Sequence, residues 1–277
     1  MVVGPLRSLD AAHASPIAYS LHVGDESLPL NERIGGGLRV AFAGKHECRH
    51  CGEETDRGFG RGYCYRCFKR LARCDLCIVS PARCHHHLGT CREPDWGEAN
   101  CMVPHTVYLA DSGGLKVGLT RHTDGIPRWI EQGARAGIVI ARAPTRRVAG
   151  ELEAAIAEAV PDKSDWRRQV LGHSVVESIA DEARRIGCLV GEDAAGRLGA
   201  TWEVGEPVTL RYPIKRPLRR PVRLKLRQDS PIEGRLIGVV GSFVLFDYGA
   251  WNVAEDIGTH ITIDDVANVA DKQGELF

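Results

Sequence analysis

The sequence lacks long hydrophobic runs. Nowhere do about 18 apolar residues follow one another, so no membrane-spanning helix is predicted. The first residues, which include Leu6, Leu9 and Ala11, also lack the basic stretch and long apolar run of a secretory signal. We therefore expect a cytoplasmic protein without membrane association, in which the cysteines remain reduced.

The sequence also lacks an excess of charge of either sign, and it has no internal repeat of solenoid length. Its 36 basic residues balance 36 acidic residues, so the chain as a whole does not favour a polyanionic partner. With 43% hydrophobic and 26% charged residues, the composition is that of a folded globular protein. The length of 277 residues allows roughly two or three small domains.

Cysteine, in contrast, is abundant and concentrated. Nine of the ten cysteines lie between Cys48 and Cys101, and the first four form the pairs Cys48-x2-Cys51 and Cys64-x2-Cys67, with twelve residues between the pairs. Two such pairs can place four thiolates about 2.3 Å from one tetrahedral zinc ion, in a closed shell with no open position for chemistry. We therefore predict a structural zinc site at these four cysteines, in preference to four ordinary buried thiols.

The later cysteines provide ligands for a second zinc site. The preferred set consists of Cys74, Cys77, Cys84 and Cys91. Cys101 or His85 could replace either of the last two. The surrounding segment has no long periodic hydrophobic pattern, so it is not expected to fold unaided, and each structural zinc ion would contribute on the order of 10 kcal/mol or more. The isolated Cys188 is expected to be a buried core residue.

The pattern of short strands, turns and amphipathic helices predicts an α+β protein. Strands are expected around 17–23, 38–43 and 138–140, in a β-hairpin of 106–110 and 115–119, and in the segments 232–246 and 259–263. Helices are expected at 127–136, at 150–160 and at 175–186, where Gly187 ends the helix. The chain then divides into an N-terminal β segment (1–45), a cysteine-rich zinc-binding block (46–103), an α+β domain (104–200), a basic proline-rich connector (201–230) and a small C-terminal β unit (231–277).

Basic residues concentrate in a strip that contains no acidic residue. Between Arg211 and Arg227, eight of seventeen residues are Lys or Arg, and Pro213, Pro217 and Pro221 interrupt helix and sheet alike. The strip is therefore expected to be extended, and it either follows phosphate groups or serves as a solvated linker. Further basic residues surround the first predicted zinc site, namely Arg57, Arg61, Arg66, Lys69, Arg70 and Arg73.

The hairpin resembles the paired motif of the GIY-YIG nuclease superfamily. In that superfamily, two strands of a small sheet each present one motif and a following helix presents an arginine. Val107-Tyr108 fits the first motif and Val117-Gly118 fits the end of the second, whereas Thr106 and Lys116 replace a glycine and a tyrosine of the family pattern. The resemblance implies a small GIY-YIG-like antiparallel sheet with flanking helices.

The same resemblance implies roles for individual residues. Tyr108 would lie beside the attacking water, and Arg128, with Arg121 as its rival, would hold the scissile phosphate. Lys116 would contact phosphate or lower the pKa of Tyr108 through its charge.

A carboxylate on the helix expected at 150–160 would bind a catalytic Mg²⁺ or Mn²⁺. The resemblance implies Glu153 for this role. A helical wheel alone leaves Glu151 open, because the two flank Leu152 by about 100° on either side.

A longer resemblance extends from Cys48 to about Val170. It includes "GYCYRCF", "CDLCI", "VYLADSGGLKVGLTR" and "RWIEQGA", and it is to an uncharacterised bacterial family, a domain of unknown function, that couples a cysteine-rich zinc block to a GIY-YIG-like domain. The "RWIEQGA" segment contains Arg128 and favours it over Arg121.

Three functions are compatible with these patterns. The first is a metal-dependent nuclease that acts on DNA in preference to RNA, with Tyr108, Lys116, Arg128 and Glu153 in the site. The second is a non-catalytic nucleic-acid-binding protein that keeps the fold but has lost the chemistry along with the second tyrosine. The third is a zinc-stabilised scaffold for protein partners, since a fold does not determine a function.

Overall fold

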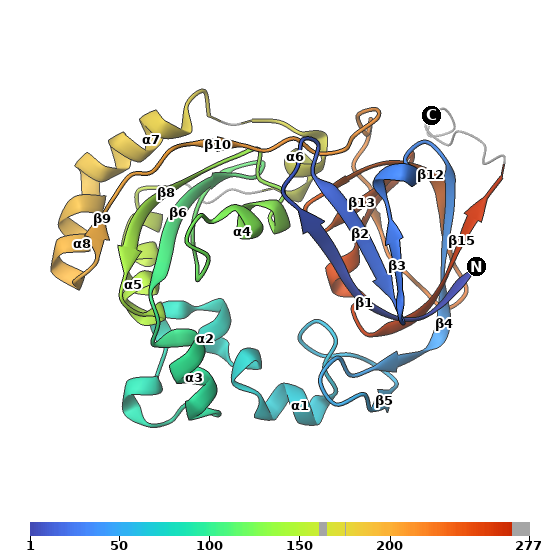
Figure 1. Ribbon diagram of the computed structural model, residues 1–277, viewed down its shortest axis with the longest axis horizontal. Helices are drawn as coiled ribbons and strands as arrows, with labels where there is room; N and C mark the ends of the chain where they lie inside the picture. Colours follow the sequence, from blue (N-terminus) through green and yellow to red (C-terminus); the bar gives the residue numbers. More distant parts are fainter. Residues whose placement is uncertain (161–164, 175, 268–277) are drawn as a thin grey trace. The chain divides into compact units, whose positions relative to one another are not determined.

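A computed structural model describes residues 1–160, 165–174 and 176–267. It is a mixed α+β structure with two sheets, which confirms the predicted fold class (Figure 1). The chain forms two compact units, one from Met1–Phe68 with Arg211–Phe277 and the other from Lys69–Leu210. None of the helices among the described residues is both long enough and apolar enough to span a bilayer.

The first unit joins an N-terminal segment and a C-terminal segment of the described chain in one ten-stranded sheet. Its order is β11-β14-β13-β12-β4-β15-β1-β2-β3, with β5 beside β4. The strands are β1 (Val2–Ala12), β2 (Ala18–Val23), β3 (Glu26–Pro29), β4 (Gly37–Glu47), β5 (Glu54–Thr55), β11 (Arg223–Leu224), β12 (Ile232–Val240), β13 (Phe243–Phe246), β14 (Gly249–Asn252) and β15 (Thr259–Val266). Because β4 pairs with both β12 and β15, the predicted N-terminal and C-terminal β segments share one sheet.

Short helical elements complete the first unit. They are η1 (Asn31–Arg33), α1 (Tyr65–Arg70) and η6 (Val253–Glu255). The core of the unit contains Leu21, Leu38, Phe246 and Trp251, all of them almost fully buried. The part of the predicted C-terminal unit beyond residue 267 lies outside the described residues.

The basic strip from Arg211 to Arg227 is extended, as predicted, but it is part of the first unit. The Lys215 backbone N–H donates to Ile237 O at 2.9 Å, and β11 pairs in parallel with β14. Such backbone pairing excludes a freely solvated linker. Most of the basic side chains of the strip are nevertheless exposed, namely Arg211, Lys215, Arg219, Arg220, Lys225 and Arg227.

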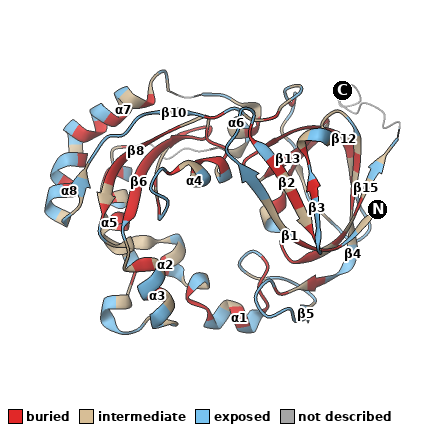
Figure 2. Cartoon of the chain, viewed as in Figure 1, coloured by how far each residue is buried: buried red, intermediate tan, exposed pale blue. Residues whose placement is uncertain are grey.

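The second unit contains a five-stranded antiparallel sheet in the order β10-β8-β6-β7, with β9 beside β8. The strands are β6 (His105–Asp111), β7 (Leu115–Thr120), β8 (Ala136–Ala143), β9 (Thr201–Trp202) and β10 (Val208–Thr209). β6 and β7 form the predicted hairpin, with Tyr108 opposite Gly118. β6 is buried along its whole length, which indicates that both faces of the sheet are covered (Figure 2).

Different helices cover the two faces of this sheet (Figure 1). One face packs its apolar side chains, such as Val107 and Leu109, against α5 (Arg146–Ala157), α7 (Ile179–Ile186) and α8 (Glu192–Leu198). The other face carries α4 (Ile126–Glu131), whose Trp129 lies over Gly137 of β8. The remaining helical elements are η2 (Ala72–Cys74), α2 (Leu76–Val79), η3 (Pro81–Arg83), η4 (His86–Leu88), α3 (Pro94–Cys101), α6 (Trp166–Leu171) and η5 (Gly187–Gly191).

The helices differ from the prediction at their ends. α5 begins earlier than expected because the Thr145 side chain caps it, accepting a hydrogen bond from the Val148 backbone N–H at 3.3 Å. The helix predicted at 175–186 begins at 179 in the structure, and Val175 lies outside the described residues.

α7 ends at Ile186 with Gly187 as its C-cap, as predicted, but the backbone remains helical beyond it. The chain continues through η5, a π-helical turn, into α8. Trp202 packs closely on both glycines. A Cβ at Gly187 would lie 3.0 Å from the Trp202 ring, and a Cβ at Gly191 would lie 2.3 Å from it. Cys188 is exposed between the two glycines, so its expected burial is wrong.

Candidate metal centres and a candidate active site

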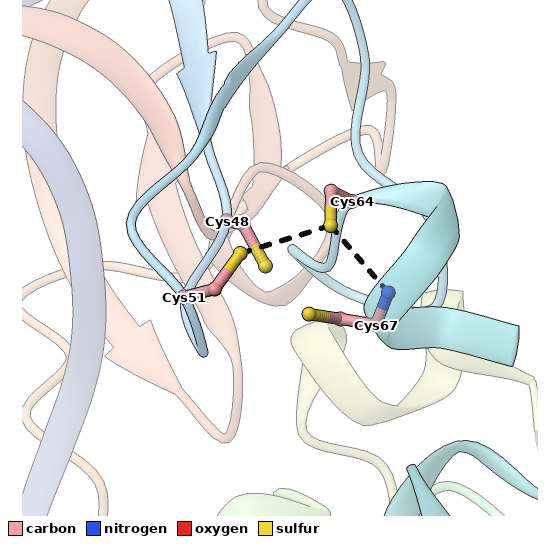
Figure 3. Close-up of side chains that lie close together, drawn as sticks. All are labelled: Cys48, Cys51, Cys64 and Cys67. Atoms are coloured by element: carbon pink, nitrogen blue, oxygen red, sulfur yellow. Dashed lines mark hydrogen bonds between the residues drawn. The ribbon is translucent and has the colours of Figure 1, made fainter. Parts of the chain in front are cut away.

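The first four cysteines converge in the first unit. Cys48 and Cys51 follow β4, Cys64 directly precedes α1, and Cys67 lies within that helix, with the side chains pointing toward one another (Figure 3). All four Sγ atoms lie within 4.8 Å of one another, and those of Cys51 and Cys64 are 3.8 Å apart. Tetrahedral Zn–S bonds of about 2.3 Å place two sulfurs about 3.8 Å apart. The cluster is therefore compatible with a structural metal ion such as zinc.

Backbone hydrogen bonds favour the thiolate of Cys48, whereas the pKa of Cys64 is raised. The Cys67 backbone N–H donates to Cys64 Sγ at 3.5 Å. Burial opposes ionisation of Cys48, but the backbone N–H groups of Cys51, Cys64 and His50 lower its pKa to about 6. Burial and the neighbouring thiols raise the pKa of Cys67, so a cation is needed for all four to ionise together. Because Cys48, Cys64 and Cys67 are at most 3% exposed, the cluster suits a structural rather than a catalytic ion.

The later cysteines belong to the second unit, in a segment of short helical turns. Cys77, Cys84, Cys91 and Cys101 all line one cavity of about 10 Å³. Burial, followed by the other three thiols, raises the pKa of Cys101 to about 11, which makes these groups electrostatic neighbours. Cys74 does not line the cavity. Three of the four residues predicted for the second site therefore line this cavity, together with Cys101.

A carboxylate and an imidazole, those of Asp75 and His85, line the same cavity. Asp75, Cys77 and His85 have ligand atoms within 4.8 Å of one another. The Asp75 carboxylate also accepts from Arg92 Nε at 2.6 Å and lies 3.7 Å from His85 Nε2. The other ring nitrogen of His85 is 2.8 Å from the Thr90 hydroxyl.

Tyr108 is held at the centre of the hairpin, on the face that carries α4. Its side chain is 1% exposed and makes an edge contact with Trp129, with ring centroids 5.9 Å apart. The backbone of Gly118 lies under the phenol, because a Cβ at this position would be 2.6 Å from Tyr108 Oη. Gly118, which matches the end of the second motif, is therefore needed because any side chain at this position would collide with the phenol of Tyr108.

Arg128 and Gln132 both reach the Tyr108 hydroxyl from the α4 region. The hydroxyl donates to Gln132 Oε1 at 3.0 Å and accepts a hydrogen bond from Arg128. Arg128 also donates to Glu131 at 2.7 Å, whereas its rival Arg121 donates to Asn100 Oδ1 at 2.5 Å. The structure therefore brings Arg128, and not Arg121, to the tyrosine.

Burial raises the pKa of Tyr108 to about 12, although Arg128 acts in the opposite direction. The charge of Lys116 was expected to lower the pKa of Tyr108, but the net shift of this pKa is upward. Lys116 is partly buried and pairs with Ala110, two residues along β6 from Tyr108.

The structure also separates the two candidate carboxylates of α5. Glu151 forms an ion pair with Arg147 at 2.7 Å. Glu153, with Val117 of β7 and residues 79–82, lines a cavity of about 330 Å³. Its negative charge is close enough to contribute to the raised pKa of Tyr108. Glu153, rather than Glu151, is thus the α5 carboxylate whose charge acts on Tyr108, although α5 covers the opposite face of the sheet from the Tyr108 side chain.

Gln132 and Trp129 are site residues that the sequence reasoning missed. Both lie in the "RWIEQGA" segment, and Gln132 follows Arg128 by four residues, so the two can face the same partner from one helical turn. The four-residue spacing between Arg128 and Gln132 is the sequence pattern that could have indicated Gln132.

Comparison with known proteins identifies the family of the chain but no function. No curated protein and no solved structure matched it. The family described as "Protein of unknown function (DUF2797)" matches residues 35–261, which include both cysteine clusters and the Tyr108 hairpin. The match gives no information about a relationship to the GIY-YIG nucleases or about the source organism. The chain therefore belongs to the DUF2797 family of proteins of unknown function.

Proposed function

We propose that this protein is a zinc-stabilised protein that acts on nucleic acid as a GIY-YIG-like, metal-dependent phosphodiesterase, with DNA preferred to RNA. One observation carries the proposal: Arg128 and Gln132 meet the hydroxyl of Tyr108, and Glu153 lies within electrostatic reach of it. A cation, a carboxylate and a hydroxyl are the groups that phosphodiester hydrolysis requires.

Each residue has a role in that reaction. The oxygen of a water molecule attacks phosphorus and releases a proton to bulk water, the bond to the leaving sugar oxygen breaks, and that oxygen takes up a proton from bulk water. Arg128, whose side chain is 43% exposed, would hold the phosphate and offset its growing negative charge. Glu153 would hold Mg²⁺ or Mn²⁺, which supplies Lewis-acid stabilisation when bound.

Tyr108 would orient the water rather than deprotonate it. With a pKa of about 12, the phenol stays protonated at neutral pH. Lys116, on the same hairpin, would contact a neighbouring phosphate.

A second candidate function, non-catalytic binding of nucleic acid, is favoured by the surface of the first unit. Tyr65 is 59% exposed and its ring lies 5.3 Å from that of Phe59. The Arg57 guanidinium lies 4.9 Å from the Phe59 ring centroid, and Arg66 is also exposed. Exposed aromatic rings among cations are typical of surfaces on which bases stack.

Cleavage assays test the enzymatic proposal. Zinc-loaded protein is incubated with single-stranded, duplex and branched DNA and with RNA, with and without Mg²⁺ or Mn²⁺. We expect metal-dependent cleavage that Arg128→Ala and Glu153→Ala abolish. The matched controls are Arg121→Ala and Glu151→Ala, which remove the same charges from the same region and should retain cleavage.

Other outcomes decide between the remaining functions. Intact substrate with salt-sensitive binding, weakened by Tyr65→Ala or by neutralising the strip from Arg211 to Arg227, would support the binding protein and reject the enzyme. No binding to any nucleic acid would reject both and leave a zinc-stabilised scaffold for protein partners.

A further inference from the structure

The second unit contains a thiol cluster that is separate from the first metal centre. Cys77, Cys84 and Cys101 are 8%, 5% and 3% exposed, and they pack together with Trp96 and Met102. With Cys91 they line a cavity of about 10 Å³, which is roughly the space of one small ion or water molecule. None of these four cysteines is in a disulfide.

We propose that this cavity is a second metal centre, in which Cys77, Cys84, Cys91 and Cys101 bind one zinc-like, thiophilic divalent cation and Cys74 does not take part. This ligand set differs from the one favoured by sequence spacing. The proposal is independent of the proposed enzymatic function, because it concerns metal binding alone.

The local backbone explains why Cys74 is outside the set. In the first centre, Cys64 and Cys67 belong to one turn, in which the Cys67 N–H bonds back to the Cys64 sulfur. Cys74 instead ends η2, and the next residue, Asp75, is extended with ψ of 157° before α2 begins. Cys74 and Cys77 therefore lie in different turns, although their spacing is the same.

Thiolates suit a zinc-like ion better by their chemistry than Asp75 or His85, although the ligand atoms that lie within 4.8 Å of one another are those of Asp75, Cys77 and His85. The Asp75 carboxylate is engaged by the Arg92 guanidinium at 2.6 Å, and His85 lies between Asp75 and the Thr90 hydroxyl. Both are thus suited to a supporting position around the thiolates, where they hold the neighbouring loop in place. A soft thiolate set also selects zinc over magnesium or calcium.

A metal ion here would tie together elements that are too short to be stable alone. Its ligands come from α2, the end of η3, the loop before α3, and the last residue of α3. α2 has four residues and α3 eight, well below the length at which an isolated helix persists in water. Four bonds to one ion would hold these turns in register.

The position of this segment links the ion to the Glu153 cavity. Gly150 of α5 packs so closely on the segment that a Cβ would lie 2.3 Å from Ala82 N. Arg146 of the same helix donates to Ile78 O at 2.8 Å. Because residues 79–82 form one wall of the cavity that contains Glu153, the second metal would act as a positioning element for that wall.

Metal analysis of the purified full-length protein tests the ligand set. We expect about two zinc ions per chain in the wild type and about one in Cys77→Ser and Cys101→Ser. Cys74→Ser and His85→Ala are the matched controls and should keep both ions. A wild type with a single zinc ion, or loss of an ion from Cys74→Ser but not from Cys101→Ser, would overturn the proposal.

Alkylation of the wild-type protein gives a test that does not depend on variants folding. Cys91 is only partly buried, so in the metal-loaded protein it should be protected from iodoacetamide by its bond to the ion. A chelator should expose it, while the exposed Cys188 reacts under both conditions. Equal labelling of Cys91 with and without chelator would reject the proposed centre.

Discussion

Replacing Gly118 with alanine provides the sharpest test of how the Tyr108 site is built. The new Cβ would lie 2.6 Å from Tyr108 Oη and 2.7 Å from Cζ, well inside normal contact distance. The ring cannot move away easily, because Trp129 packs against it and the hydroxyl is bonded to Gln132 at 3.0 Å. Overpacking of this kind costs about 1 to 3 kcal/mol, and loss of the buried hydrogen bond adds about 1 kcal/mol.

We therefore expect Gly118→Ala to lower the free energy of unfolding by about 2 to 4 kcal/mol and the Tm by roughly 5 to 10 °C, measured by urea and thermal denaturation. Gly196→Ala is the matched control. Gly196 is exposed in α8 and has no atom within 4 Å of a Cβ, so alanine there should stabilise the helix by about 0.5 to 1 kcal/mol. A Gly118→Ala protein as stable as the wild type would refute the close packing of Tyr108 on β7.

Three further predictions concern metal content and pH. Cys64→Ser should lose the metal of the first centre and unfold at lower temperature, whereas Cys188→Ser should keep full metal content, as measured by elemental analysis. Burial lowers the pKa of His105 from 6.5 to about 4, so its contribution to stability is complete above pH 6.5 and is lost as the pH falls toward 4; NMR titration of the ring checks the pKa. The pKa of Tyr108 is raised from 10.0 to about 12, so its contribution is complete below pH 10.0 and is lost as the pH rises toward 12. Tyr108→Phe should lack that alkaline component in denaturation curves, and an unchanged curve would contradict the raised pKa.

Local patterns in the sequence were sufficient for the first cysteine cluster and the hairpin. Cys48, Cys51, Cys64 and Cys67 form two tight turns whose geometry depends on a few neighbouring residues. The pairing of β6 with β7 is likewise a contact between neighbours in the chain. Such contacts require little loop closure, so spacing and turn residues predict them.

The same spacing gives a different local structure where the backbone turns differently. Cys74 and Cys77 repeat the pattern of Cys64 and Cys67, but the extended conformation of Asp75 separates them. Cys101, at the far end of α3, joins the cavity only because the intervening turns fold back on themselves. No local signal carries that information.

What the sequence alone determined is the α+β class, the first cysteine cluster, the hairpin and the apolar face of α5, since each follows from short-range periodicity or spacing. Tertiary structure decided the rest. Pairing of β4 with β12 and β15 joins distant parts of the chain in one sheet, and the packing of α4 on the Tyr108 face of the second sheet brings Arg128, rather than Arg121, to the phenol. Those outcomes depend on which surfaces fit together across long stretches of chain, and only the folded protein specifies that fit.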